Sequence, residues 1–497
     1  MTRLLIANRG EIAVRIIRAC RDLGISPVAV YSEADRAALH VRLADWAVPI
    51  GPAPARDSYL VVEKLLDAAK KTGATMLHPG YGFLSENAAF ARRVVEAGLT
   101  WVGPSADSIA AMGSKTESRR RVLAAGVPIV PGMTTPAKSA EEIAEFGREN
   151  GFPLLLKATA GGGGKGMRVV RSAAEVPEAY ARARSEARSY FADDAVYAEL
   201  FVEGSRHVEV QVLGDSTGRI LAVGERECSL QRRHQKVLEE CPSAAVGPEL
   251  RARMEAVAVA AAKSVDYVSA GTVEFLLAKD GRFFFLEMNT RIQVEHPVTE
   301  VVYGVDLVAE MIRIARGEPM SVREKPAPRG HAIQCRIYAE DPAHGFAPSP
   351  GRILRLRRPQ GPGIRVDSGV EGGDVVPLDY DPMIAKFVAW GRDRDEALRR
   401  MRRALSESRV DGIETSIPFF LSLLEDPDVV ANRISTQFLD SWTYVPKRPP
   451  EDVAAASIVA AALETMDGAN KRRPEAAPGG AGRGAWRTAR MSFGVRE

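Results

Sequence analysis

A run of glycines with one lysine, residues 161–166 (GGGGKG), restricts the fold of this chain most strongly. Glycine lacks a Cβ atom, so successive backbone amides can approach and bind a phosphate chain. Apolar residues precede and follow the run (152–158 and 167–170), which predicts two flanking strands. A P-loop would need a following helix, with serine or threonine in place of Gly166. The pattern therefore predicts a β-hairpin flap that closes over phosphates, with a merely flexible turn as the alternative.

The first hundred residues alternate between apolar strands and helical repeats. Residues 4–7 and 27–31 predict strands, and the apolar residues between them recur at helical spacing. The turn after the first strand holds one glycine, so the GxGxxG fingerprint of dinucleotide-binding folds is absent. Two further short strands are predicted at 75–77 and 100–103. The pattern predicts a doubly wound α/β domain over residues 1–113.

Polar residues follow the apolar strand 283–286 (FFFL). If the extended conformation persists, one face carries Glu287, Asn289, Arg291, Gln293 and Glu295. A further carboxylate, Glu274, lies within the apolar strand 271–277. Oxygen ligands from adjacent strands suit Mg²⁺, which binds one or two carboxylates together with substrate phosphates. The pattern predicts a metal site, with exposed cross-strand charge pairs as the alternative.

A dense cationic run, residues 231–236 (QRRHQK), lies inside a folded region. Such a run is typical of a solvated loop, but beside a phosphate-binding loop and metal carboxylates it becomes a candidate anion clamp. Lys157 ends an apolar strand at the mouth of the glycine run, where we expect a contact with a phosphate or a base. Lys115 is a weaker candidate on its own.

Three other patterns concern packing. Alternation over 207–212 predicts a half-buried strand. Residues 352–356 and 383–390 predict two further strands. Residues 394–408 predict a helix whose inward face holds Leu398, Met401 and Leu405.

Charge and composition exclude several classes of function. The chain has 67 basic and 64 acidic residues, but seven basic and only two acidic residues lie between 468 and 497. Nothing in the nearly neutral body therefore suggests nucleic-acid binding. The longest uncharged stretch, 122–137, contains three prolines and cannot span a membrane. The four cysteines fit no metal or disulfide spacing, and we expect reduced thiols in a soluble, cytoplasmic protein.

Long motifs in a fixed order point to a family. They are IANRGEIAVRIIRA at the start, HPGYGFLSEN (78–87), GGGGKGMRVV (161–170), RHVEVQV (206–212), ECSLQRRHQKVLEE (227–240) and EMNTRIQVEHPVTE (287–300). Through these motifs the chain resembles the ATP-grasp biotin carboxylases. These are the ATP-using components of acetyl-CoA, propionyl-CoA and pyruvate carboxylases. The resemblance covers roughly residues 2–445.

The resemblance implies a mixed α/β and α+β architecture. Residues 1–113 would form the N-terminal, or preATP-grasp, domain. Residues 114–330 would form the ATP-grasp domain, with a glycine-rich lid over about 132–203. Residues 331–445 would form the C-terminal biotin carboxylase domain. The last segment, 446–497, would be a linker and a basic tail, and its Gly, Pro and Ala content predicts disorder.

The resemblance also assigns site residues, position by position. Those that would contact ATP are Lys115, Lys157, Gly163, Gly164, His207 and His234, with Glu199, Leu200, Phe201 and Val202 at the adenine. The implied metal ligands are Glu274, Glu287 and Asn289. The implied bicarbonate pocket consists of Lys236, Arg291, Gln293 and the Val294 backbone. Glu295 matches the proposed base, and Arg336 matches the arginine that faces the biotin ureido group.

The implied activity is a ligase reaction that carboxylates biotin with bicarbonate and ATP, through carboxyphosphate, with Mg²⁺ or Mn²⁺. It is the first half-reaction of an acyl-CoA carboxylase. The implied partners are a biotin carboxyl carrier protein and carboxyltransferase subunits, and members of the family are often homodimers. Two alternatives remain: another ATP-grasp ligase that joins a carboxylate to an amine, and a non-catalytic subunit with a decayed nucleotide site.

The attachment of biotin is a separate expectation. Multifunctional relatives continue into a small domain that carries biotin on the lysine of a Met-Lys-Met motif. This chain contains no Met-Lys-Met. We therefore expect biotin to be a substrate on a separate carrier protein, not a group attached covalently to this chain.

Overall fold

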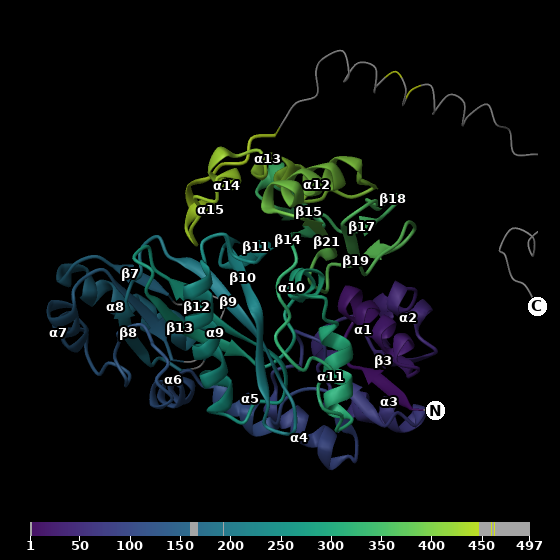
Figure 1. The fold of residues 1–497 in the computed structure, drawn as a ribbon, viewed down its shortest axis with the longest axis horizontal. Coiled ribbons are helices and arrows are strands. Elements are labelled where there is room, and N and C mark those ends of the chain that lie inside the picture. Colours follow the sequence, from purple (N-terminus) through teal and green to yellow (C-terminus); the bar gives the residue numbers. More distant parts are fainter. Residues whose placement is uncertain (1, 160–166, 192, 447–458, 460–461, 463–497) are drawn as a thin grey trace, which may run out of the picture. The chain divides into compact units, whose positions relative to one another are not determined.

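The computed structural model describes residues 2–159, 167–191, 193–446, 459 and 462. The chain divides into two units, Met1–Val445 and Pro446–Glu497 (Figure 1). The glycine run and the tail, for which the sequence predicts a phosphate-binding flap and disorder, lie outside the described residues. In the described part of the chain, no helix is long and apolar enough to cross a membrane.

The N-terminal sheet is parallel, as the doubly wound prediction requires. Its strand order is β3 (Trp46–Gly51), β2 (Ser26–Ser32), β1 (Arg3–Ile6), β4 (Met76–His78) and β5 (Thr100–Trp101). The connecting helices are α1 (Gly10–Asp22), α2 (Leu39–Leu43), α3 (Val62–Thr72) and α4 (Ala88–Glu96). Leu4, Leu5 and Ile6 on the central strand are fully buried, because helices cover both faces of a parallel sheet.

An eight-stranded antiparallel sheet forms the centre of the first unit. Its order is β13 (Phe283–Asn289), β12 (Ser269–Leu277), β9 (Arg206–Gly214), β10 (Ile220–Arg232), β11 (Gln235–Cys241), β14 (His331–Tyr338), β21 (Met383–Gly391) and β19 (Ile364–Ser368). The prediction that β9 is half-buried is wrong. Its polar face, with His207, Glu209 and Gln211, is buried as completely as its apolar face, because other polar groups cover it.

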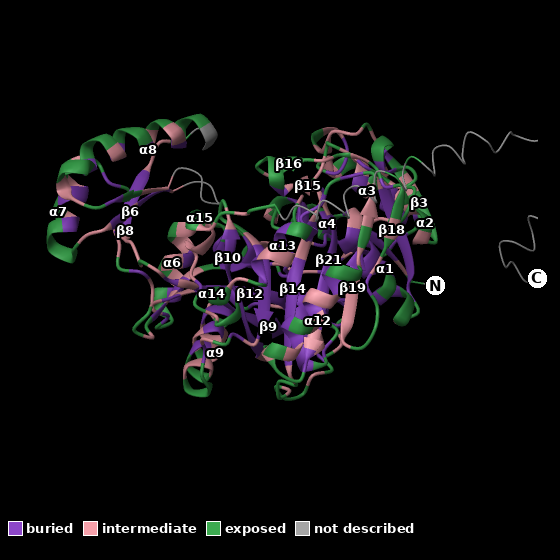
Figure 2. Cartoon of the chain, turned by 90° about the horizontal axis from the view of Figure 1, so that it is seen from above, coloured by how far each residue is buried: buried purple, intermediate pink, exposed green. Residues whose placement is uncertain are grey.

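A smaller sheet lies apart from the central sheet (Figure 2). It consists of β7 (Arg168–Val170), β6 (Leu154–Ala158) and β8 (Val196–Leu200), packed against α7 (Ala140–Asn150) and α8 (Val176–Phe191). These elements share their own apolar core, which includes Ile143 and Leu156. Strands β6 and β7 pair antiparallel, as the sequence predicts for the strands that flank the glycine run.

The C-terminal part of the first unit extends the central sheet. Because β11 pairs with β14, the sheet continues across residue 330, where the sequence predicts a domain boundary. Helix α12 (Arg394–Glu407) packs on β21 and buries the three predicted apolar residues, Leu398, Met401 and Leu405. The predicted single strand over 352–356 is wrong. Two short strands, β17 (Gly351–Arg352) and β18 (Arg355–Arg357), pair with β20 (Val375–Val376) and β22 (Arg409–Asp411).

Further elements connect and cover these sheets. They are α5 (Ala106–Gly113), α6 (Lys115–Ala124), α9 (Pro248–Lys263), α10 (His296–Tyr303), α11 (Leu307–Ala315), β15 (Glu340–Asp341), β16 (Ala347–Pro348), α13 (Ile417–Leu423), α14 (Pro427–Val430) and α15 (Phe438–Ser441). Helix α10 contacts β10, β11, β14 and β21, so its position follows the central sheet. The four cysteines are buried and free, which agrees with the expected reduced thiols.

Candidate active site

One cavity of about 1390 Å³ collects most of the predicted site residues. The predicted residues that line it are Lys115, Lys157, Glu199, Leu200, Phe201, Val202, His207, His234, Lys236, Glu274, Glu287, Asn289, Arg291, Gln293, Val294 and Arg336. Glu295 is fully buried behind this lining and contacts two of its cations, Lys236 and Arg336. Gly163 and Gly164 lie outside the described residues.

Four charged residues form a row across the central sheet. Arg226 on β10 pairs with Glu209 on β9, and Glu209 pairs with Glu274 on β12. Glu274 in turn pairs with Glu287 on β13. Directly paired residues of antiparallel strands point to the same face. The four side chains, called the charged row from here on, therefore lie on one side of the sheet.

Lys236 is held among three carboxylates. Its ammonium group donates to Glu209, to Glu274 at 2.7 Å and to Glu295 at 2.9 Å. Burial would lower the pKa of Lys236, but these carboxylates outweigh burial and raise it well above its ordinary value. Lys236 is therefore a fixed positive charge at the wall of the cavity.

The cationic run that contains Lys236 is the hairpin between β10 and β11. The chain reverses at Arg233 and His234, whose φ angles are 51° and 64°, and both side chains are exposed. Arg232 pairs with Glu340 at 2.7 Å. The reversal returns Lys236 toward Glu209, so Lys236 is the one member of the run that contacts Glu209, Glu274 and Glu295.

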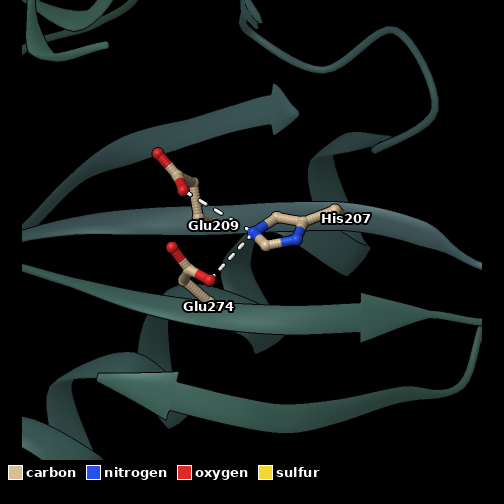
Figure 3. Close-up of side chains that lie close together, drawn as sticks. All are labelled: His207, Glu209 and Glu274. Carbon is tan, nitrogen blue, oxygen red and sulfur yellow. Dashed lines mark ion pairs between the residues drawn. The ribbon is translucent and has the colours of Figure 1, made fainter. Parts of the chain in front are cut away.

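His207 lies beside Glu209 and Glu274 (Figure 3). Its Nε2 atom is 3.1 Å from a Glu274 oxygen and 3.7 Å from a Glu209 oxygen. Burial would lower the pKa of His207, but the charge of Glu274 outweighs burial and raises the pKa to about 9. The three groups are close enough to share a metal ion. The Lys236 ammonium already binds both carboxylates, so His207 adds a second cation at this point.

Glu274, Glu287 and Asn289 offer oxygen atoms for a divalent cation. Glu287 is exposed to the cavity, and among the described residues it makes no hydrogen bond or ion pair. Its pKa is raised, because the surrounding cavity wall displaces water and the charge of Glu274 also disfavours the ionised form. A bound divalent cation would stabilise the ionised form of Glu287 beside Glu274. The oxygen-rich donor set fits Mg²⁺, which prefers carboxylate and amide oxygens to nitrogen or sulfur ligands.

Glu295 and Arg336 form a second charged contact. Glu295 directly precedes α10, and one of its oxygens lies 3.0 Å from an Arg336 Nη atom. Arg336 on β14 also donates from Nε to Glu239 on β11 at 2.5 Å. Burial would raise the pKa of Glu295, but Lys236 and Arg336 outweigh burial and lower it. Glu295 is therefore a carboxylate, and Arg336 is held between two carboxylates.

The segment between β13 and α10 bends toward the charged row. The extended conformation on which the shared face depends does not persist, because β13 ends at Asn289 and α10 begins at His296. The bend still gathers the predicted residues: Gln293 donates to Glu274 at 2.9 Å, and Arg291 donates to Asn289 at 2.8 Å. The residues converge through a turn and not through a continuous strand.

The opposite side of the cavity carries Lys115, Lys157 and Glu199. Glu199 on β8 is buried and pairs with Lys157 on β6 and with Arg119 on α6. The pKa of Lys115 is lowered, because burial and the nearby charge of Lys157 both disfavour its ammonium form. An anion bound between the two lysines would relieve their repulsion. This side therefore suits a phosphate group or a base, as the sequence predicts.

Sequence reasoning missed several residues of the site, among them Arg226, Glu209, Glu239 and Arg119. The alternation of residues 207–212 places His207 and Glu209 on one face, which was the available signal for Glu209. Arg226, Glu239 and Arg119 have no such signal, because their roles depend on which strand or helix lies opposite.

Comparison with known domain families gives three matches along the chain. Residues 1–109 match "Biotin carboxylase, N-terminal domain", and residues 114–323 match "Carbamoyl-phosphate synthase L chain, ATP binding domain". Residues 334–441 match "Biotin carboxylase C-terminal domain". Fold and site together define an ATP-dependent ligase of the ATP-grasp class.

Two relatives and two solved structures show which family within this class the chain resembles. The chain is 52% identical to biotin carboxylase 1 of Bacillus subtilis (strain 168), over 88% of this chain and 98% of that protein. It is 49% identical to a pyruvate carboxylase subunit of Methanothermobacter thermautotrophicus, over 89% and 90% of the two chains. The Campylobacter jejuni biotin carboxylase–β,γ-ATP complex superposes with a TM-score of 0.86, at 42% identity, over 89% and 99%.

The second structure is the biotin carboxylase domain dimer of Hydrogenobacter thermophilus 2-oxoglutarate carboxylase, in complex with MgADP, ADP and bicarbonate. It superposes with a TM-score of 0.84, at 44% identity, over 88% of this chain and 97% of that chain. The chain belongs to the biotin carboxylase family.

Proposed function

We propose that the chain carboxylates biotin with bicarbonate and ATP, as the first half-reaction of an acyl-CoA or keto-acid carboxylase. The observation that carries this proposal is an anion pocket beside a metal-type site: Lys236, Arg291 and Arg336 line the same cavity as Glu274 and Glu287. The related Hydrogenobacter domain, solved with MgADP and bicarbonate, supports the assignment.

Bicarbonate is a stable anion, so it must be activated before it can react with biotin. Lys236 and Arg291 would hold its oxygens in line with the γ-phosphate of ATP. Glu295 would accept the bicarbonate proton while the oxygen attacks phosphorus; its ionised state and its contact with Lys236 at 2.9 Å support this role. The products of this step are carboxyphosphate and ADP.

ATP would bind in the cavity, between the two lysines and the metal-type site. Lys115 and Lys157 would contact the nucleotide from one side, where an anion relieves their mutual repulsion. Glu274, Glu287 and Asn289 would hold the divalent cation from the other side. Mg²⁺ or Mn²⁺, when bound there, neutralises charge on the triphosphate.

Arg336 would act in the second step. Carboxyphosphate yields CO₂ and phosphate, and the phosphate takes the N1 proton of biotin. The resulting enolate carries negative charge on the ureido oxygen, which Arg336 would stabilise. Glu239 and Glu295 hold Arg336 in place through its Nε and Nη atoms, so the guanidinium is oriented before biotin binds.

We further propose that biotin arrives on a separate carrier protein, and that a carboxyltransferase then uses the carboxybiotin. The Methanothermobacter relative is named as one subunit of a carboxylase, and this chain spans 90% of its length, which supports a division of the two half-reactions between chains. A homodimer is proposed because the Hydrogenobacter domain is described as a dimer.

Steady-state ATP hydrolysis tests the proposed function. Release of ADP should require bicarbonate and a divalent cation, and free biotin should accelerate it. A ligase that joins a carboxylate to an amine would instead release ADP only with those two substrates and would ignore bicarbonate. Hydrolysis that is independent of bicarbonate at all biotin concentrations would contradict the proposal.

A further inference from the structure

Arg226 is the largest fully buried side chain among the described residues. Its guanidinium donates to four side chains: Glu209 at 2.5 Å, Gln211 at 2.7 Å, Thr299 at 2.9 Å and Thr272 at 3.0 Å. Arg226 does not line the cavity, and all the hydrogen bonds of its guanidinium go to side chains of this chain. A charge that is buried this completely needs partners that are themselves fixed.

Arg226 reaches the anion pocket by two routes. One oxygen of Glu209 accepts from Arg226 and the other accepts from Lys236, so this carboxylate links the two cations. Thr299 belongs to α10, the helix that Glu295 directly precedes. One guanidinium therefore holds both the carboxylate that orients Lys236 and the helix that places Glu295.

The charge of the row also depends on Arg226. It is the only cation of the charged row, because Glu209, Glu274 and Glu287 are all carboxylates. Without its charge, Glu209 would keep only Lys236 and the more distant His207 as cationic partners, and would draw the Lys236 ammonium group away from an incoming anion. Loss of one positive charge would also make the pocket less favourable for an anion and more favourable for a divalent cation.

We propose that Arg226 is a positioning residue for bicarbonate: it fixes Glu209 and α10 so that Lys236 and Glu295 face the substrate. The inference rests on the proposed function, because it assigns the anion as bicarbonate. It makes different predictions for the two small ligands of the site, bicarbonate and Mg²⁺. The requirement for bicarbonate should rise when Arg226 is neutralised, whereas the requirement for Mg²⁺ should not.

The experiment measures ATP hydrolysis as a function of bicarbonate, Mg²⁺ and ATP for the full chain and four variants. Arg226→Met should raise the bicarbonate KM by about tenfold or more, as expected when one partner of a buried charge pair is removed. Arg226→Lys keeps the charge and should restore part of the loss. Thr299→Val removes one hydrogen bond and should raise the bicarbonate KM by about two- to fivefold. The matched control is Arg251→Met, which releases the buried carboxylate of Glu225 on the same strand.

The proposal is supported if the KM rises for bicarbonate alone in the Arg226 and Thr299 variants, while the bicarbonate KM of Arg251→Met stays at the wild-type value. Melting curves identify any variant that does not fold, and Arg226→Lys and Thr299→Val then decide the question. An equal rise in the KM values for Mg²⁺ and ATP, or the same rise in the bicarbonate KM of Arg251→Met, would overturn the proposal. Either result would indicate a general loss of structure. A wild-type bicarbonate KM in all three variants would overturn the positioning role alone. A wild-type chain without bicarbonate dependence would overturn the proposed function as well.

Discussion

Two clusters of charged side chains in the described part of the first unit differ in what surrounds them. The first is the charged row with Lys236, where Lys236, Glu274 and Glu287 line the cavity. The second, called the junction cluster, is centred on Glu300, whose carboxylate accepts from Arg15 at 2.9 Å and from Arg365 at 2.7 Å. None of these three residues lines the cavity.

The junction cluster joins three segments of the sequence. Arg15 belongs to the segment that matches the N-terminal domain family, Glu300 to the ATP-binding segment and Arg365 to the C-terminal segment. Lys386 and Glu11 add a second buried bridge at 3.0 Å between the C-terminal and N-terminal segments. Similar ion pairs therefore serve two purposes: those of the charged row leave charge available to substrate, and those of the junction cluster hold the segments together.

The sharpest test of this division is Glu295→Ala, which should lower biotin carboxylation by two or more orders of magnitude. The reason is the loss of a positioned general base, which contributes about 10²- to 10⁴-fold to the rate. Binding of ATP, measured by calorimetry, should survive, because Glu295 contacts Lys236 and Arg336 and not the Lys115 side of the cavity. Turnover near the wild-type rate would refute the base assignment.

The corresponding test for the junction is Glu300→Gln. Two arginines would then share a neutral amide, and we expect the free energy of unfolding to fall by about 3 kcal/mol, the usual cost of breaking a buried ion pair. Urea denaturation measures the change. The bicarbonate KM of the folded variant should rise no more than that of Thr299→Val, because Glu300 shares α10 with Thr299 but does not line the cavity. Glu371→Gln, at an exposed partner of Arg42, is the control and should be nearly neutral. A large shift in KM with little loss of stability would remove the distinction between the clusters.

The residues of the two clusters also differ in whether the sequence alone could predict them. Glu274 and Glu287 were predictable as a pair, because each follows or lies within an apolar strand, and the register places them opposite one another. Pattern alone predicted Lys236 only as part of a cationic run, because nothing local distinguishes it from Arg233, which the turn leaves exposed. The family resemblance, in contrast, assigned Lys236 to the bicarbonate pocket. Arg226 and Glu300 could not be predicted, since the arginine–glutamate pairs that give each its role join residues more than fifteen positions apart.

His78 provides a smaller test, based on pH, next to the junction. Burial and the charge of Arg15 lower the pKa of His78 to about 3, so the folded protein keeps this ring neutral. The unfolded chain takes up a proton near pH 6.5, so the contribution of His78 to stability is complete above pH 6.5 and is lost as pH falls toward 3. At pH 5 the loss should be about 2 kcal/mol.

His78→Asn isolates this effect. The asparagine oxygen can replace Nδ1, which accepts from the Gly80 amide at 3.0 Å, and the side chain does not titrate. Urea melts between pH 7 and pH 5 should therefore show a smaller loss of stability in His78→Asn than in the wild type. Equal slopes for the two proteins would show that the folded protein does not hold His78 neutral.

The smallest effect is expected at an exposed ion pair between the N-terminal and C-terminal segments. Arg42 lies in the N-terminal segment and donates to Asp374 at 2.7 Å and to Glu371 at 3.0 Å, but its side chain is 40% exposed. Water and salt screen such a pair, so Arg42→Met should lower the free energy of unfolding by only about 0.5 kcal/mol. That small difference should shrink further at high salt, whereas the effect of Glu300→Gln should persist because the junction is buried. If Arg42→Met costs as much as Glu300→Gln, the junction owes its strength to bridging the segments and not to burial of its charges.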